Sequence, residues 1–356
     1  MDDGEKRPWF SSITAVVRWN LTMRAYEIEK FGIEDLTLVE RAVPKPGPGQ
    51  VLVRLRAASL NYRDMMMVEG TYNPRLRLPL VPFSDGAGEV AELGEGVTKW
   101  KTGDRVCPIF MQGWLDGGIS YAKSRTTLGG DLDGCLREYA AFDQEGLVRI
   151  PEGLSYEEAS TLPCAAVTAW NALTVSGDLK RDETVLIQGT GGVAMFAFQF
   201  AKLFGARTIV ISGSDGKLER MRLQGADEVI NYKEREDWDT AVLDLTEKNG
   251  VDHVIEIGGA GTIQRSMRAA RMGGHIAVIG VVAGEGHFTT VPIFMKALRL
   301  QGVFVGSREM FEAMNKTIES NALEPVIDRV FDFEGVREAL EYMKSGAHFG
   351  KIVVAI

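Results

Sequence analysis

Residues 185–204 (VLIQGTGGVAMFAFQFAKLF) constrain the fold more than any other part of this sequence. The segment reads as a short apolar strand, a glycine-rich turn and then an amphipathic helix. The turn contains Gly189, Gly191 and Gly192, and because glycine has no Cβ, the backbone there can come close to a phosphate. The first turn of the helix adds unpaired N–H groups and the positive end of its dipole. The pattern predicts the site that holds the pyrophosphate of a dinucleotide.

Strand-like and helix-like segments alternate after this motif. Apolar residues recur at helical spacing behind the turn, starting at Val193. Five further strands are expected, at 207–213, 228–232, 251–259, 273–281 and 298–306. Helices are expected between them, at 217–224, 237–248, 262–271 and 292–297. Strands that alternate with helices form a parallel sheet covered on both faces, so the sequence predicts an α/β, doubly wound sheet of six strands.

Composition limits the possible partners. The chain has 356 residues, 45% of them hydrophobic and 25% charged, which indicates a globular protein of about two domains. The net charge of −9 argues against nucleic acid or an anionic membrane as partner, because both need a basic face. No apolar run has the length of a membrane span. Three cysteines in so long a chain do not make a disulfide framework, and they favour the cytoplasm.

The first half of the chain has a different pattern. Residues 23–150 show short strands separated by turns of proline and glycine, which is typical of a small, mostly β, barrel-like domain. The tail from residue 323 returns to short strands around one helix, and we expect it to rejoin this domain. Residues 1–22 lack the features of a targeting peptide and are expected to be a loosely ordered extension.

Several phrases of the sequence resemble the medium-chain dehydrogenase/reductase superfamily, and most closely its zinc-free quinone oxidoreductase and enoyl reductase branch. They are PGPGQVLVRLRAASLNYRD, DGAGEVAELGEGV, GDRV, EEASTLPCAAVTAW, GTGGV, ADEVINY and HFGKIVV. The resemblance implies a GroES-like, mostly-β catalytic domain at residues 23–158 and 310–356. It also implies a Rossmann-type domain at residues 159–309, with the cofactor between the two.

The resemblance also locates the positions where zinc-dependent members bind their catalytic metal. In this chain they hold Asn61, the pair Ser84–Asp85, and Cys164. Catalytic zinc needs three good protein ligands, and asparagine and serine are poor ones. The region of the structural zinc lobe contains only Cys107. We therefore predict a protein without metal, in which Cys164 is a small buried residue at a helix start.

The end of the second strand of the motif bears on the choice of cofactor. NAD-specific sites carry an acidic residue there, but this strand ends at Ser212, followed by a glycine and Ser214. Both serines can donate to a 2′-phosphate, and Lys217 adds positive charge. NADPH is therefore favoured, with NADH possible. In the family, a lysine and the tyrosine of a V-I-N-Y phrase line this pocket, which implies Lys217 and Tyr232; Lys217 as an ordinary surface lysine is the alternative. Asp215 does not fit this pattern, since its carboxylate could either oppose the phosphate or point into solvent.

The resemblance implies nicotinamide contacts from Asn61 and Thr168, and from the backbone near Val281 and Val305. Asn61 has an alternative role as a turn residue.

Two residues are candidates for proton supply and charge stabilisation. Tyr72 lies in a G-x-Y phrase (residues 70–72) that resembles the one from which enoyl-thioester reductases take their proton donor. A tyrosine that only packs on the substrate is the alternative. Arg63 stays charged, so it could hold an oxyanion or a substrate carboxylate. We expect Arg63 to pair with Asp85, and Asp64 to support the loop.

Without zinc, hydride delivery to an electron-poor carbon is easier than alcohol oxidation, because zinc normally stabilises the alkoxide. The sequence thus favours an NADPH-dependent oxidoreductase acting on quinones or on the activated C=C of α,β-unsaturated carbonyl compounds. The alternatives are an alcohol or aldehyde dehydrogenase-like enzyme and an inactive NADPH-binding protein. The apolar edge strand at 298–306 predicts a homodimer.

Overall fold

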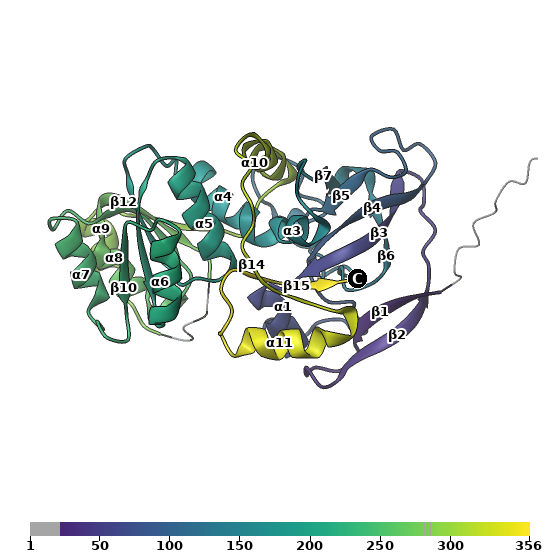
Figure 1. The fold of residues 1–356 in the computed structure, drawn as a ribbon, viewed down its shortest axis with the longest axis horizontal. Helices are drawn as coiled ribbons and strands as arrows, with labels where there is room; N and C mark the ends of the chain where they lie inside the picture. Colours follow the sequence, from purple (N-terminus) through teal and green to yellow (C-terminus); the bar gives the residue numbers. More distant parts are fainter. Residues whose placement is uncertain (1–21, 281, 283, 285) are drawn as a thin grey trace, which may run out of the picture.

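The computed structural model describes residues 22–280, 282, 284 and 286–356. The expected extension at residues 1–22 lies outside this range, except for Thr22. Figure 1 shows two lobes side by side along the long axis of the molecule, one rich in antiparallel strands and one built on a parallel sheet. Both predicted architectures are therefore present. The domain limits at 158/159 and 309/310 stay a prediction.

The β-rich lobe holds a two-stranded hairpin and a seven-stranded sheet. The hairpin pairs β1 (Thr22–Ile28) with β2 (Leu36–Ala42). The larger sheet runs in the order β14-β15-β3-β4-β5-β7, and β6 pairs with the second edge of β3. Its first strands are β3 (Gln50–Ser59), β4 (Asp85–Leu93), β5 (Arg105–Pro108), β6 (Tyr139–Asp143) and β7 (Leu147–Arg149). Two short helices lie in this part of the chain, α1 (Tyr62–Val68) and α2 (Tyr121–Ser124).

The parallel sheet of the other lobe has the order β10-β9-β8-β11-β12-β13, as the sequence predicts for a doubly wound fold. Its strands are β8 (Thr184–Gln188), β9 (Arg207–Ser212), β10 (Glu228–Asn231), β11 (Val251–Glu256), β12 (Ala270–Val278) and β13 (Arg299–Gly302). Its helices are α5 (Gly192–Leu203), α6 (Asp215–Leu223), α7 (Trp238–Leu245), α8 (Ile263–Ala269) and α9 (Val291–Met295). The main difference from the prediction is β13, which covers only residues 299–302 in the first half of the apolar run at 298–306.

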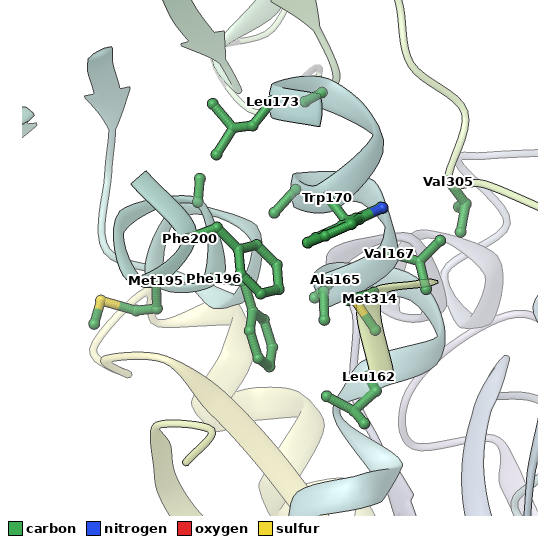
Figure 2. Packing of buried hydrophobic residues seen from close by; sticks show 14 of the residues in the cluster. Leu162, Ala165, Val167, Trp170, Leu173, Met195, Phe196, Phe200, Val305 and Met314 are labelled. Carbon is green, nitrogen blue, oxygen red and sulfur yellow. The ribbon is translucent and has the colours of Figure 1, made fainter. Parts of the chain in front are cut away.

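A chain of short helical segments joins the two lobes. It consists of α3 (Tyr156–Ser160), a π-helical turn at Leu162–Ala166, α4 (Val167–Trp170) and a second π-helical turn at Asn171–Val175. Trp170 packs edge-on against Phe200 of α5 with ring centroids 5.5 Å apart, and Figure 2 shows both rings with Phe196 in the same buried cluster. That cluster includes Phe110 from the β-rich lobe and Val305 from the parallel-sheet lobe, so the two lobes share a core.

The C-terminal segment returns to the first lobe, as predicted. It contains α10 (Arg308–Ser320), β14 (Ile327–Phe331), α11 (Val336–Lys344) and β15 (Lys351–Ala355). β15 pairs antiparallel with β3, while Gly350, just before it, forms a bridge with Gly191 of the glycine turn. This segment therefore contacts both lobes. No helix among the described residues is long and apolar enough to cross a membrane.

Candidate active site

The strand order of the parallel sheet reverses between β8 and β11, and ligands of doubly wound sheets bind at the carboxyl ends of strands at such a point. The glycine turn follows β8 there. Gly189 has a φ of +78°, a conformation that side-chain-bearing residues rarely adopt. Gly191 is the N-cap of α5 and makes no side-chain capping bond, so the first N–H groups of the helix remain available for an anion. The turn, with Val193 half-buried behind it, fits a pyrophosphate.

The residues predicted for the 2′-phosphate gather at the carboxyl ends of β9 and β10. The N–H of Tyr232 donates to the carbonyl of Ser212 (3.2 Å), and a Cβ built on Gly213 would come within 2.9 Å of the Tyr232 hydroxyl. Ser214 is the N-cap of α6 and makes no side-chain capping bond. Lys217 lies one turn further along, and its Nζ donates to the carbonyl of Gly346 (2.6 Å).

Asp215, the acidic residue that does not fit the phosphate prediction, is hydrogen-bonded by a residue of the neighbouring strand β10. Asn231, the last residue of β10, donates from Nδ2 to Oδ1 of Asp215 (2.8 Å). This contact occupies one carboxylate oxygen on the side of Asp215 that faces β10. The remaining predicted residues, Ser212, Ser214, Lys217 and Tyr232, lie around the same strand ends, and Lys233 is also there, with its Cε 2.9 Å from the position of a Cβ on Gly213.

The predicted nicotinamide residues come from three separate segments. Thr168 is buried in α4. One turn later, Nδ2 of Asn171 donates to the carbonyl of Val305 (2.7 Å), which brings the segment after β13 against α4. Val305 has a φ of +58°, an uncommon conformation for a β-branched residue. Val281, the other predicted contact, lies outside the described residues.

Asn61 is the N-cap of α1, and it forms a capping box with Asp64. The turn role that the sequence left as an alternative is therefore present. The Asn61 side chain also has partners outside its own helix, because its Oδ1 accepts from Nζ of Lys351 (2.7 Å) and its Nδ2 donates to Oγ of Ser84 (3.4 Å). These contacts fix the amide orientation, with the oxygen facing the lysine and the nitrogen facing Ser84.

Lys351 is the residue that the sequence reasoning missed. Its ammonium is buried, donates to the carbonyl of Leu60 (2.6 Å) and to Asn61, and lies 3.9 Å from Oδ2 of Asp85. Its side chain also runs beside the glycine turn, since a Cβ on Gly192 would meet Cδ of Lys351 at 2.6 Å. The only sequence signal was the phrase HFGKIVV, to which the prediction assigned no role. Lys351 thus connects the glycine turn with Asn61.

Asp85 is the buried anion of this group. Oδ1 accepts from Oγ of Ser84 (2.7 Å), and Oδ2 accepts from the backbone N–H of Cys164 (3.2 Å) and from Oγ of Ser59 (3.5 Å). Burial raises the pKa of Asp85, and the Lys351 ammonium opposes that rise. Burial lowers the pKa of Lys351, and Asp85 opposes that shift in turn. The two groups therefore stabilise each other's charged form inside the protein.

The three positions that zinc-dependent relatives use therefore surround an ammonium group. Asn61 and Asp85 contact Lys351 directly, and the Lys351 charge acts on the pKa of the Cys164 thiol. Cys164 is half-buried in the π-helical turn rather than fully buried as predicted. Within the described part of the chain, no group of three His, Cys, Asp or Glu side chains could hold a metal ion. The residues at these positions do not fit Zn²⁺, because asparagine is a poor ligand and a fixed cation already contacts both Asn61 and Asp85.

Arg63 does not pair with Asp85, so that expectation is wrong. The Nη1 of Arg63 is instead 3.5 Å from Oδ1 of Asp64 and donates to the carbonyl of Leu128 (3.1 Å). Its guanidinium stacks on Phe110 at 4.9 Å. Asp64 supports the loop as expected, by accepting from the backbone N–H groups of Asn61 and Ser84. Burial raises the pKa of Asp64 to about 6, against the opposing charge of Arg63.

Tyr72 follows α1, with 44% of the residue exposed, and its ring lies 5.6 Å from the Arg63 guanidinium. The phenol of an exposed tyrosine beside a cation can donate a hydrogen bond to a bound oxygen. The structure brings Tyr72 and Arg63 together. The Nη groups of Arg63 are used by Leu128, Thr127 and Asp64, and its Nε is buried without a partner among the described residues. Tyr72 is the freer of the two for contact with a substrate.

Two family models match the chain: "Alcohol dehydrogenase GroES-like domain" over residues 47–152 and "Zinc-binding dehydrogenase" over residues 192–320. A zinc-type alcohol dehydrogenase-like protein of Schizosaccharomyces pombe is 44% identical over 333 residues, which are 91% of this chain and 96% of the relative. The solved structure of a Sinorhizobium meliloti 1021 protein, assigned to the alcohol dehydrogenases, has a TM-score of 0.88 and 41% identity, and the match covers 95% of this chain and 100% of that one. The chain belongs to the medium-chain dehydrogenase/reductase superfamily of oxidoreductases.

More distant relatives carry two kinds of name. An alcohol dehydrogenase of Geobacillus stearothermophilus is 30% identical over 347 residues, covering 94% of this chain and all of the relative. A 2-methylene-furan-3-one reductase of Solanum lycopersicum is 31% identical over 339 residues, covering 93% and 79%. The structure of 2-octenoyl-CoA carboxylase reductase CinF in complex with NADP and 2-octenoyl-CoA has a TM-score of 0.83 and 25% identity, covering 95% and 88%.

Proposed function

We propose that this protein is an NADPH-dependent oxidoreductase that delivers hydride to quinones or to the activated C=C bond of α,β-unsaturated carbonyl compounds, without zinc. The single observation that carries the proposal is the Lys351 ammonium among Asn61, Asp85 and Cys164. An alcohol substrate needs a Lewis acid that holds its alkoxide, whereas a conjugated carbonyl needs only hydrogen-bond donors for the developing oxyanion. Relatives whose names describe C=C reduction support the same reading.

Each residue of the site has a defined part in this proposal. Bound NADPH would supply the hydride that adds to the electron-poor carbon. Asn61, with its Oδ1 held by Lys351, directs its amide nitrogen at Ser84 over 3.4 Å, and the carbonyl oxygen of the substrate would take the place of this long contact. Tyr72 provides a phenolic proton, either to that oxygen or to the carbon beside the carbonyl. The buried pair of Lys351 and Asp85 fixes these positions, and the net charge of the pair is zero.

A substrate panel tests the function. NADPH oxidation is measured with quinones, enones, enoyl thioesters and aldehydes, and the zinc content of the same sample is measured by mass spectrometry. We expect turnover with quinones or enones, none with simple aldehydes, and no stoichiometric zinc. Oxidation of alcohols that a chelator abolishes would support the alcohol dehydrogenase alternative. Tight NADPH binding without turnover of any acceptor would support the inactive-protein alternative.

Tyr72→Phe tests the proton donor in the same assay. If Tyr72 is the general acid, its loss should lower kcat roughly 10²-fold, while the Kd for NADPH stays unchanged. Tyr121→Phe is the matched control, because Tyr121 is also exposed but lies in α2. An unchanged kcat in Tyr72→Phe would leave this residue as a packing surface for the substrate.

Lys217→Ala tests the preference for NADPH. A charge-assisted contact with a phosphate is worth about 1.5–3 kcal/mol, so we expect the Kd for NADPH to rise roughly 10- to 100-fold. The Kd for NADH should hardly change. Lys202→Ala is the control, since Lys202 pairs with Asp227 near the far end of α5. An equal loss of affinity for NADPH and NADH would show that Lys217 acts through its hydrogen bond to Gly346 and not on the 2′-phosphate.

We also propose a homodimer joined at β13, the edge strand of the parallel sheet. The neighbouring helix α9 exposes Phe294 and Met295, at 68% and 63%, which is a large apolar surface next to an open edge. Sedimentation should give twice the mass of one chain, and Phe294→Lys combined with Met295→Lys should give the mass of one chain. A wild-type protein that sediments as a single chain would contradict the dimer.

The three cysteines are free, which supports a reducing compartment such as the cytoplasm.

A further inference from the structure

His348 lies in the loop between α11 and β15, directly against the glycine turn. Its Nε2 is 3.6 Å from the position that a Cβ on Gly191 would occupy. The backbone on both sides is fixed, because the N–H of Gly350 donates to the carbonyl of Thr190 (2.8 Å) and Gly350 bridges Gly191. The imidazole therefore lies beside the N-cap of α5.

The other ring nitrogen of His348, Nδ1, is buried and has no hydrogen-bond partner among residues 22–280, 282, 284 and 286–356. A buried polar atom without a partner costs about 1–3 kcal/mol, so its retention needs a reason.

The charges around His348 come from three elements. Lys217 of α6 and Lys351 of β15 are cations, and Asp328 of β14 is the only acid acting on the ring in the described structure. Asp328 is itself engaged, since it accepts from Tyr342 (2.7 Å) and pairs with Arg220 (3.5 Å). Burial, followed by Lys217, lowers the pKa of His348 to about 4. The imidazole is therefore neutral near pH 7, beside two lysines and a helix start that all favour an anion.

We propose that His348 is a further binding residue for the pyrophosphate of the dinucleotide, which it contacts as an imidazolium, so that the cofactor takes up a proton as it binds. The inference rests on the proposed function, because it needs a dinucleotide at the glycine turn. An opposite charge within about 4–6 Å raises a pKa by roughly 1–3 units, and the pyrophosphate carries two such charges. Proton uptake is therefore expected between pH 4 and the higher pKa of the complex.

The sign of the pH dependence follows from these two pKa values. Below pH 4 the ring is charged in both states, and well above the pKa of the complex it is neutral in both, so affinity is independent of His348 at each extreme. Between them only the complex holds the proton, so affinity rises as the pH falls. The free 2′-phosphate of NADP⁺ titrates in the same range, which makes ADP-ribose the better probe, because it carries the pyrophosphate alone.

Calorimetry of ADP-ribose and NADP⁺ binding, in buffers of different ionisation enthalpy at pH 6 and pH 8.5, measures this uptake. We expect about half a proton or more at pH 6 for wild type, little at pH 8.5, and an affinity for ADP-ribose that is several-fold tighter at the lower pH. His348→Asn and His348→Gln should bind ADP-ribose without this uptake. His287→Asn is the matched control, because His287 is an exposed histidine.

The outcomes separate the inference from the proposed function. If wild type binds both ligands but takes up no proton at pH 6, or takes up as much as the His348 variants, the inference is overturned. If wild type binds neither ligand, the proposed function fails as well. Should both variants fold poorly, NMR titration of wild type decides the question, because one of its four histidines must gain a higher pKa on addition of ADP-ribose.

Discussion

Lys351→Met should lower both stability and turnover. Removing one partner of a buried ion pair leaves the other charge uncompensated, at a cost of about 3–5 kcal/mol, and Asp85 would be that charge. The Asn61 amide would lose the donor that fixes its orientation. Because loss of one oriented oxyanion donor costs roughly 10²- to 10³-fold, we expect kcat to fall by at least the lower value while the KM for the acceptor changes little. Urea unfolding and single-turnover NADPH oxidation measure the two effects.

A double variant separates these two effects. Lys351→Met combined with Asp85→Asn removes both charges, and replacing a buried pair with neutral groups is often close to neutral for stability. We therefore expect the unfolding free energy to recover while kcat stays low. Lys351→Arg keeps the charge and should retain part of the activity. If the double variant recovers both stability and kcat, Lys351 is only a structural partner of Asp85 and does not position Asn61.

Glu256→Ala should destabilise the parallel-sheet lobe and weaken cofactor binding together. Glu256 ends β11 at the point where the strand order reverses, and its buried carboxylate accepts from Gly259 N–H (2.9 Å), Gln188 Nε2 (2.8 Å), Thr262 and Ser266. Gln188, at the end of β8, uses its own oxygen to accept from the N–H groups of Ile257 and Gly258 (both 3.1 Å). One carboxylate thus holds the loop that follows β11.

The expected loss of unfolding free energy follows from the number of buried polar groups that are left without a partner. Each such group costs about 1–3 kcal/mol, so we expect the unfolding free energy to fall by roughly 3–5 kcal/mol in Glu256→Ala and by less in Glu256→Gln. The Kd for NADPH should rise about tenfold or more in both, because the loop borders the glycine turn. Glu219→Ala, at an exposed pair with Arg222, should change neither quantity. A Glu256→Gln variant with unchanged stability and Kd would show that the loop does not depend on this carboxylate.

The parallel sheet could be predicted from the sequence because the pattern that marks each of its strands lies within a few consecutive residues. Each strand is a short apolar run between helix-like segments, and handedness then leaves few possible orders. The observed order β10-β9-β8-β11-β12-β13 confirms this. The end of the last strand was less predictable, because the run at 298–306 stays apolar after it leaves the sheet to pack on α4, where Asn171 binds the carbonyl of Val305.

The centre of the site could not be predicted, because its contacts join distant parts of the chain. Lys351 and Asn61 are 290 residues apart, and a lysine in an apolar strand gives no sign of which partner will neutralise it. Arg63 was expected to pair with Asp85, because Asp85 was expected near the floor of the cleft. In the structure, helix α1 turns Arg63 towards Phe110 and Leu128, while Asp85 faces Lys351. Motifs identify the members of a site, and only the fold determines which members meet.

The late position of β15 also has a consequence for how the molecule is made. At about 5–20 residues per second, a ribosome that has synthesised Asn61 needs roughly 15–60 s to reach Lys351, 290 residues later. During that interval the nascent β-rich lobe has Asp85 without its cation and β3 without one of its neighbouring strands. The centre of the site can therefore assemble only after nearly the whole chain has been synthesised.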